Sequence, residues 1–259
     1  MANSNLPTLA FFGATGGCTI HSLVPSLNAG YKCRALVRSP QKLEDMLLQQ
    51  HGLSESTLKT NLTMVKGNVN DVAAVRQALV GPDNQPVDLI ISGIGGQMSF
   101  SNPLRPTLSD PTVCASAMST ILEAARELPK SPRLAVISTT GIDKRRDLPV
   151  AMMPLYHWML KEPHADKRNM EAMILKQMEL PARDRAISSY LILRPSFLTE
   201  GEGDGMHKIK EGTADKPAVG YVIARSDVGR WIFERVVRDY KREPSQEDPV
   251  GGRIVTLTT

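Results

Sequence analysis

Residues 11–30, FFGATGGCTIHSLVPSLNAG, join an apolar segment to a glycine-rich turn and then to a helical pattern. Gly13 allows a tight turn, and Gly16 or Gly17 lets the backbone approach a pyrophosphate, which would lie at the positive end of the helix. Glycines at this spacing are informative only between a strand and a helix, and both are predicted here. The stretch therefore predicts a dinucleotide-binding turn formed by Gly13, Thr15, Gly16 and Gly17.

Thr19 departs from this pattern because it stands where a third small residue is usual. That position serves close packing of the helix on the strand and makes no phosphate contact. We expect the β-branched side chain to push the helix slightly outward and to leave the phosphate cradle intact.

Apolar, β-branched segments alternate with helical patterns along the rest of the chain. Near-continuous apolar strands between helices indicate a parallel sheet that is covered on both faces. The expected fold class is α/β, a Rossmann-type doubly wound parallel sheet in a single domain that spans residues 1–259. We expect strands at residues 8–12, 32–37, 62–66, 87–92, 133–139 and 189–193, a last strand at the sheet edge at 253–257, and helices at 18–29, 40–50, 71–80, 111–128, 164–178 and 227–240.

Two long segments, residues 93–110 and 195–217, are expected to be loops that follow the carboxyl ends of strands. Doubly wound sheets bind ligands at this edge, so both loops are predicted on the substrate side, together with residues 141–165. The part of the chain after residue 150 would contribute a small substrate-side lobe. Residues 51–61 have the character of a surface insertion.

The composition limits the classes of partner. The chain has 259 residues, 41% of them apolar and 22% charged, and a net charge of +4, which is ordinary for a soluble globular protein. No base-stacking aromatic residues accompany the basic run at 143–147, so nucleic acid is not expected. Three scattered cysteines predict no metal and a reducing compartment, and no apolar run approaches the roughly 18 residues of a membrane span. We expect a cytoplasmic protein, monomeric or homodimeric, that binds a small-molecule substrate and no membrane.

The end of the second predicted strand bears on which dinucleotide binds. An NAD site generally has an acidic residue there for the ribose 2′-hydroxyl, but KCRALVRSPQKL has no acid before Glu44. Arg38 ends the strand instead, with Arg34 and Lys42 near it, and a guanidinium suits a 2′-phosphate. The expected cofactor is NADP(H), and an exposed basic turn is the alternative.

Six segments stand in one order and at one spacing: GATGG, RALVRSPQKL, VKGNVND, VDLIISGIGG, LAVISTTGI and LILRPSFLT. Together they resemble the atypical short-chain dehydrogenase/reductase group, the NAD(P)-binding NmrA-like proteins that include flavin reductases of the biliverdin reductase B type. The resemblance covers nearly the whole chain. It is fairly specific for the superfamily and less so for any one activity.

The resemblance also implies cofactor contacts. Where the family more often has Asp beside the adenine, this chain has Asn68, a mild departure. The implied contacts are the turn from Gly13 to Gly17 with the pyrophosphate, Arg38 with the 2′-phosphate, Asn68 and Val69 with the adenine, Gly93 and Ile94 with the ribose, Ser138 and Thr139 with the nicotinamide, and Pro195, Ser196 and Phe197 as a backbone clamp on the carboxamide.

Short-chain reductases commonly use a Tyr and a Lys four residues later, together with a Ser, and Tyr156 is not followed by such a Lys. Lys167 is the better candidate because Met170, Ile174 and Met178 repeat at helical spacing and Lys167 shares their inward face. A lysine on an apolar face needs a polar partner, which a ribose hydroxyl of bound cofactor would supply. A snorkelling lysine at a helix start is the alternative.

The proton donor stays open at this point. Tyr156 has a suitable phenol, and His157 or His164 could also donate, although packing roles would explain all of them. Flavin-type and quinone-type acceptors need no protein acid because water can protonate them. The candidate catalytic residues are Lys167, Tyr156 and Ser138.

Methionines are frequent on the substrate side of the chain and predict an apolar pocket for a flat substrate, with a Met-rich helix core as the alternative. The expected function is NADPH-dependent reduction of a planar carbonyl or quinone compound, such as a polyketide-like aromatic of secondary metabolism. The alternatives are an NADP(H)-sensing regulator and a non-redox isomerase, dehydratase or cyclase. The residues in question are Met152, Met153, Met159, Met170, Met173 and Met178, with Pro154, Tyr156 and Trp158.

Overall fold

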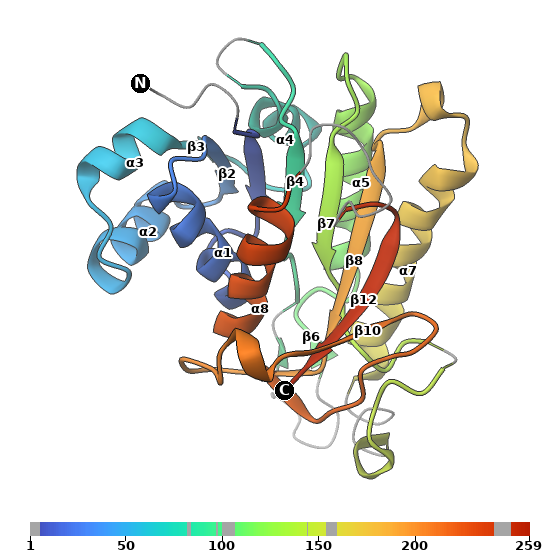
Figure 1. Cartoon of the computed structure of the whole chain (residues 1–259). Helices are drawn as coiled ribbons and strands as arrows, with labels where there is room; N and C mark the ends of the chain where they lie inside the picture. Colours follow the sequence, from blue (N-terminus) through green and yellow to red (C-terminus); the bar gives the residue numbers. More distant parts are fainter. Residues whose placement is uncertain are drawn as a thin grey trace.

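An eight-stranded sheet crosses the centre of the computed structural model, which describes residues 6–81, 84–96, 98–99, 107–143, 145–153, 160–240 and 250–259 (Figure 1). All pairs of neighbouring strands are parallel except the pair at one edge, in which β10 runs antiparallel to β12. This confirms the expected doubly wound sheet. The order across the sheet is β10 (Lys210–Thr213), β12 (Arg253–Thr258), β8 (Ser189–Pro195), β7 (Arg133–Ile137), β4 (Leu89–Ser92), β1 (Leu9–Phe12), β2 (Cys33–Val37) and β3 (Leu62–Lys66).

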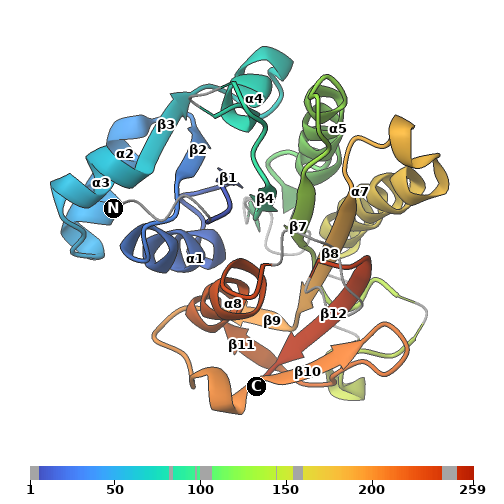
Figure 2. The ribbon, with the colours of Figure 1, turned by 45° about the horizontal axis from the view of Figure 1, so that its top comes forward.

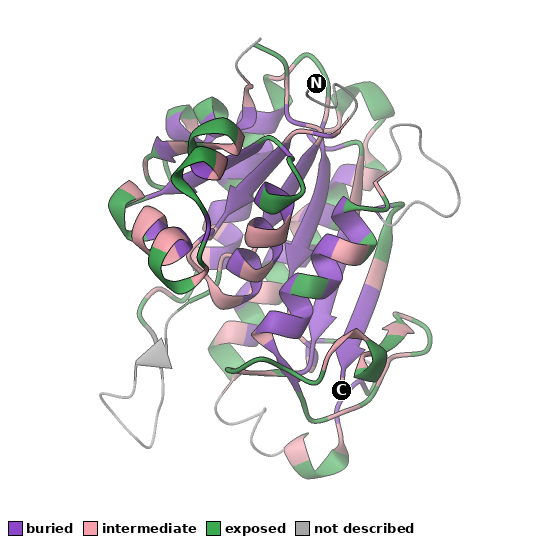
Figure 3. Cartoon of the chain, turned by 60° about the vertical axis from the view of Figure 1, so that its left-hand side comes forward, coloured by how far each residue is buried: buried purple, intermediate pink, exposed green. Residues whose placement is uncertain are grey.

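Helices cover both faces of the sheet, as Figure 2 shows. Successive residues of β1 belong to opposite cores: Leu9 and Phe11 pack on one face, and Ala10 and Phe12 on the other. Figure 3 shows the buried strands enclosed between these layers. One layer holds α1 (Gly17–Asn28), α2 (Pro40–Asp45), α3 (Glu55–Asn61) and α8 (Arg225–Ile232), and the other holds α4 (Val72–Leu79), α5 (Val113–Arg126) and α7 (Lys161–Glu179).

Two expectations about the chain are corrected. The strand at the carboxyl end, β12, is not the sheet edge, because β10 from the predicted loop 195–217 pairs with its outer side. Residues 51–61 are not a plain surface insertion, because they contain α3 and bury Leu53 and Leu58 in the core. Short strands also occur in the predicted loops. In the first, β5 (Met98–Ser99) pairs with β6 (Thr107–Leu108); in the second, β9 (Phe197–Thr199) pairs with β11 (Val222–Ala224), which lies beyond the loop.

Several helices begin at an identifiable cap. The Asp71 carboxylate accepts hydrogen bonds from the first-turn amides of α4, and Ser39 caps α2 ahead of Pro40. The start of α5 is capped from another helix: the carboxylate of Asp166 in α7 accepts from the amides of Cys114 and Ala115 at 2.8 and 2.9 Å. Gly16 caps α1 and has no side chain to satisfy the first amides of the helix.

The crevice of a doubly wound sheet lies where neighbouring strands lead to opposite helix layers. Here that point is between β1 and β4, because the chain passes from β1 to α1 on one face and from β4 toward α5 on the other. Within the described ranges, none of the helices combines the length and apolar character needed to span a membrane.

Candidate active site

The glycine turn lies at the carboxyl end of β1, at the mouth of this crevice. Gly13 has a φ of +75°, and a Cβ placed on it would lie 3.0 Å from the carbonyl of Gly93. A Cβ on Gly16 would lie 3.0 Å from the carbonyl oxygen of Gly13. Side chains are therefore disfavoured at Gly13 and Gly16, and the first amides of α1 are left without a side-chain cap. These features fit the diphosphate of a dinucleotide.

Thr19 fits into the space that Gly93 leaves. The threonine is 1% exposed, and a Cβ on Gly93 would lie 2.0 Å from its Oγ1 atom and 3.4 Å from its Cβ. The β-branched residue in the third motif position is thus accommodated by the missing side chain at the end of β4. Its buried hydroxyl has no hydrogen-bond partner among the described residues.

Lys167 joins two strands at the same edge of the sheet. Its Nζ atom donates hydrogen bonds to the carbonyl oxygens of Ile94, at 2.9 Å, and Ile137, at 2.7 Å. Met170 and Ile174 on the same face of α7 are buried, so the side chain of Lys167 points at the sheet as its spacing predicts. The polar partner that this lysine needs is supplied here by backbone carbonyls.

Ser138 directly follows β7 beside this lysine. Its amide donates to the carbonyl of Leu193 at 2.7 Å, whereas its hydroxyl, in a residue 4% exposed, has no partner within the part of the chain that the structure describes. A buried hydroxyl without a partner is unfavourable, which makes this group a candidate for contact with a bound molecule. Thr139 is partly exposed, and its hydroxyl donates to the carbonyl of Thr140.

The positive charges of Arg225 and Lys167 influence Cys18, in the first turn of α1. Burial raises the pKa of the Cys18 thiol to about 11, while Arg225 and Lys167 lower it and Glu200 raises it further. Arg225 is paired with Glu200 at 2.8 Å. Sequence reasoning missed Arg225 and Glu200, because the helix expected at 227–240 begins after Arg225 and no pattern in the loop 195–217 indicates a partner for Glu200.

At the end of β2 the structure separates two arginines that were expected to lie together. Arg38 is exposed immediately after the strand, as expected, and Lys42 is exposed in α2. Arg34 is buried instead and donates to the carbonyls of Gln77 and Ala78 at the end of α4. Arg34 therefore stabilises the end of α4. The expectation that it belongs to the basic group around the 2′-phosphate is wrong.

The segments that the resemblance places around the rest of the cofactor lie at this same edge. Asn68 and Val69 follow β3; the Asn68 side chain accepts from the amide of Asn70 at 3.1 Å, and Val69 packs against the core. Gly93 and Ile94 follow β4, and the amide of Gly93 donates to the carbonyl of Phe12 at 3.0 Å. All four positions follow the carboxyl ends of parallel strands, the edge at which doubly wound sheets bind ligands.

The expected clamp after β8 is already engaged in the fold. The amide of Ser196 donates to Leu257 at 2.8 Å, the amide of Phe197 donates to Tyr221 at 3.3 Å, and the carbonyl of Pro195 accepts from Thr140. Neither amide is available to a carboxamide in this arrangement. The carbonyl of Pro195 also accepts from the hydroxyl of Thr140 at 3.3 Å, so of these groups the exposed ring of Phe197 is the one that could still contact a ligand.

A cavity of about 380 Å³ opens between residues 141–153 and the first turns of α7. Asp147 is its most buried acid, 3% exposed: one carboxylate oxygen accepts from the amide of Gly141 at 2.9 Å, and the other has no partner among the described residues. Burial raises the pKa of this carboxyl, and the bond from Gly141 partly offsets that effect. Asp147 is a buried acid that sequence reasoning missed.

The cavity differs from the expected methionine-lined pocket. Its lining includes the basic residues Arg145, Arg146, Lys161 and Arg168, the acids Asp143 and Asp147, and the buried His164. Of the described methionines only Met153 lines it, whereas Met170, Met173 and Met178 pack in the core on α7. Tyr156, His157, Met159, Pro154 and Trp158 lie outside the described residues.

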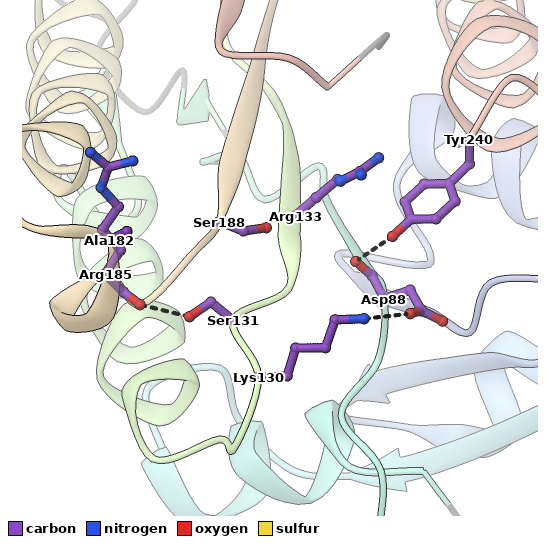
Figure 4. Close-up of a pocket in the computed structure, with 8 residues that line it drawn as sticks. All are labelled: Asp88, Lys130, Ser131, Arg133, Ala182, Arg185, Ser188 and Tyr240. Carbon is purple, nitrogen blue, oxygen red and sulfur yellow. Dashed lines mark hydrogen bonds and ion pairs between the residues drawn. The ribbon is translucent and has the colours of Figure 1, made fainter. Parts of the chain in front are cut away.

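A second cavity, of about 290 Å³, lies at the amino ends of the strands (Figure 4). Lys130 lies 3.6 Å from the carboxylate of Asp88, Ser131 donates to the carbonyl of Arg185, and Arg133 stacks over Tyr240. These polar groups satisfy one another. The cavity is at the opposite edge from the glycine turn, so it is not a candidate for the cofactor.

The chain is similar to known proteins over almost its full length. The NAD(P)H-binding family matches residues 13–239. A reductase of Aspergillus terreus, pytE, is 49% identical over 99% of both chains, and an oxidase of Aspergillus niger, pynE, is 34% identical over 89% of this chain and 93% of its own. The structure of ChuY, an anaerobillin reductase from Escherichia coli, superposes with a TM-score of 0.61 at 20% identity over 96% of both chains.

The family match confirms the resemblance carried by the six sequence segments. It agrees with the glycine turn and uncapped helix start, which fit a dinucleotide, and the curated relatives are a reductase and an oxidase. Of the three functions expected from sequence, a redox enzyme is the one that these comparisons favour. The chain belongs to the NAD(P)H-binding family and is an oxidoreductase that uses a nicotinamide cofactor.

Proposed function

We propose that this oxidoreductase uses NADPH to reduce a planar carbonyl or quinone compound. The position of Lys167 carries the proposal, because its ammonium group joins the carboxyl ends of β4 and β7 beside the glycine turn. From there it would reach the ribose hydroxyls of a nicotinamide nucleotide whose diphosphate lies at the start of α1. Delivery of a hydride to the substrate is the chemistry that NADPH supplies when bound.

The preference for NADPH over NADH rests on Arg38. The residue is exposed at the end of β2, where the adenine ribose would lie, and no acid occupies that strand end. A guanidinium binds a 2′-phosphate through paired hydrogen bonds, whereas an NAD site uses a carboxylate for the 2′-hydroxyl.

The remaining residues take roles that follow their positions. Ser138 would contact the substrate oxygen with its buried hydroxyl, and Tyr156 is the proposed proton donor. Asp147 is the more buried of the two described acids that line the adjoining cavity. The adenine and ribose would lie along Asn68, Val69, Gly93 and Ile94, and Thr139, Pro195 and Phe197 would border the nicotinamide.

The cavity beside α7 narrows the class of substrate. Among the described residues, four basic side chains and two acidic ones line it, which gives this part of the lining an excess of positive charge. Such a surface favours a planar compound that carries a negative group, such as an enolate or a phenolate, over an uncharged one. The proposed substrate is therefore an acidic aromatic or enolic carbonyl compound.

Two naphthoquinones test this proposal because they share a ring system and differ in charge. Lawsone is an anion at neutral pH and menadione is neutral. We expect NADPH absorbance to fall on addition of either quinone, with a lower KM for lawsone and with a difference that shrinks as salt is added. No quinone-dependent loss of NADPH would contradict the proposed reaction, and an equal KM for the two compounds would contradict the charged pocket.

Replacement of Lys167 tests the observation on which the proposal rests. We expect Lys167→Met to lower kcat about a hundredfold, because the ribose loses its ammonium partner and the nicotinamide loses its orientation. Lys176→Met, which removes an exposed lysine from the same helix, is the control and should leave kcat unchanged. Unchanged turnover in a folded Lys167→Met protein would make Lys167 a structural residue.

A further inference from the structure

The first turn of α8 lies against the start of α1, where the glycine turn ends (Figure 2). A Cβ on Gly17 would lie 2.5 Å from Cδ of Arg225, with Cβ and Cγ of the arginine at 3.3 and 3.4 Å. The aliphatic stem of Arg225 therefore crosses the first residue of α1. At Gly13 a side chain would meet the backbone of Gly93, whereas at Gly17 the missing side chain leaves room for Arg225.

The guanidinium group of Arg225 is held by a partner that water can replace. Its Nε atom donates to Glu200 at 2.8 Å, and the two side chains are 35% and 82% exposed. An ion pair in such an exposed position contributes little to stability, because solvent screens it. A diphosphate offers two adjacent charged groups, each of which can accept paired hydrogen bonds from a guanidinium.

The backbone around Arg225 is fixed more firmly than its ion pair. The hydroxyl of Ser226 donates to the carbonyl of Gly201 at 2.7 Å. The fully buried carboxylate of Asp227 accepts from the amides of Asp204 and Gly205 at 2.8 and 3.1 Å. The arginine thus projects from an anchored helix end, and its side chain can exchange partners without movement of α8.

We propose that Arg225 is a coenzyme-binding residue whose guanidinium leaves Glu200 and binds the diphosphate at the start of α1. The inference rests on the proposed function, because it requires a dinucleotide in the glycine turn. The amides of α1 supply partial charge, and Arg225 supplies the full positive charge that the turn itself lacks. Glu200 holds the arginine in place in the free protein and competes with the coenzyme.

Fragments of the coenzyme separate this contact from the others. 2′-Phospho-ADP-ribose contains the diphosphate, whereas 2′-AMP retains the adenine and the 2′-phosphate but lacks the diphosphate. If the wild type prefers NADH, ADP-ribose and adenosine are the corresponding pair of fragments. We expect Arg225→Met to weaken binding of the diphosphate fragment about tenfold in calorimetry and to leave the other fragment unchanged. Arg225→Lys should retain part of the affinity. Arg238→Met, which removes an arginine that is also paired with a glutamate, is the control.

A second variant tests the exchange without disturbing the helix contact. Glu200→Gln removes only an exposed carboxylate, and we expect it to bind the diphosphate fragment more tightly than wild type, most clearly at low salt. Wild-type affinity in Arg225→Met would overturn the contact, and unchanged or weaker binding in Glu200→Gln would overturn the competition. A folded wild-type protein that binds neither NADPH nor NADH would instead overturn the proposed function.

Discussion

Individual residues of one type take different roles in this protein because their surroundings differ. Arg34 lies in β2 and is buried against the end of α4, whereas Arg38 directly follows the strand and is exposed. The first arginine satisfies helix carbonyls and is unavailable to a ligand. Of the two, only Arg38 is exposed and available to a ligand.

This difference predicts the effect of removing Arg38. We expect Arg38→Ala to raise the Kd of NADPH about tenfold or more and to leave the Kd of NADH unchanged, because only the 2′-phosphate contact is lost. Fluorescence titration of the bound nicotinamide measures both constants. Lys176→Ala, which removes an exposed cation from α7, is the control. Equal weakening of both coenzymes would refute the assignment of NADPH.

Asp147 predicts a pH dependence of stability. Its carboxyl faces Gly141, Asp143, Arg194 and the basic lining of the cavity, and burial raises its pKa above that of the unfolded chain, about 3.9. Such a group stabilises the fold fully below the unfolded pKa, and that contribution is lost as the pH rises through the folded pKa.

Asp147→Asn keeps an oxygen for the amide of Gly141 and removes the ionisation. We expect this variant to gain unfolding free energy relative to wild type at pH 7 and to lose that gain as the pH falls toward about 4. Urea unfolding between these pH values measures the difference. A constant difference across the range would show that the carboxyl of Asp147 is not perturbed in the folded protein.

At the scale of elements, helices are held to one another by specific polar contacts as well as by apolar packing. Asp166 of α7 caps α5, a helix far from it in the sequence, while the neighbouring residue Lys167 reaches β4 and β7. One turn of α7 thus fixes a helix start and two strand ends. The position of the candidate active site depends on that turn.

Removal of the cap should therefore be costly. We expect Asp166→Ala to lower the free energy of unfolding by about 2 kcal/mol, because two buried amides lose their acceptor. Asp166→Asn, which keeps one acceptor oxygen, should lose less. Asp71→Ala removes an exposed cap from α4 and provides the comparison in the same urea titration, with an expected loss of about 1 kcal/mol. Equal losses at the two sites would contradict a buried cap.

The limits of sequence reasoning also follow from individual elements. Strands such as β3 and β7 are found within a few residues because their apolar runs are local signals, and the inward face of α7 follows from its spacing. The place of β10 beyond β12 depends on pairing between distant segments. Asp147 and Arg225 lie in an irregular loop and at a helix start, where no periodic pattern indicates burial or neighbours.

At the scale of the whole molecule, the parallel sheet brings strand ends from across the chain to one edge. The glycine turn, Lys167, Ser138 and Arg225 come from four separate segments and meet there. The opposite edge holds a cavity whose polar groups bind one another. A coenzyme in the crevice between β1 and β4 should therefore contact the strands on both sides of it, β1–β3 on one side and β4, β7 and β8 on the other.

This arrangement predicts stabilisation of the entire domain by coenzyme. At a free NADPH concentration a hundred times its Kd, we expect the free energy of unfolding to rise by about 2.7 kcal/mol, in a single cooperative transition with a higher Tm. Differential scanning calorimetry with and without NADPH measures the shift. A transition that splits in two would indicate that the halves of the sheet unfold independently.

The fit of Thr19 against Gly93 restricts how this enzyme can be engineered. Grafting a standard three-glycine loop onto the chain would leave a hole beneath the turn, where the threonine side chain now fills the end of β4. The peptide units above that hole would lose their support just where the coenzyme must bind. A redesigned loop would have to restore the missing volume from the strand side, with a larger residue at position 93.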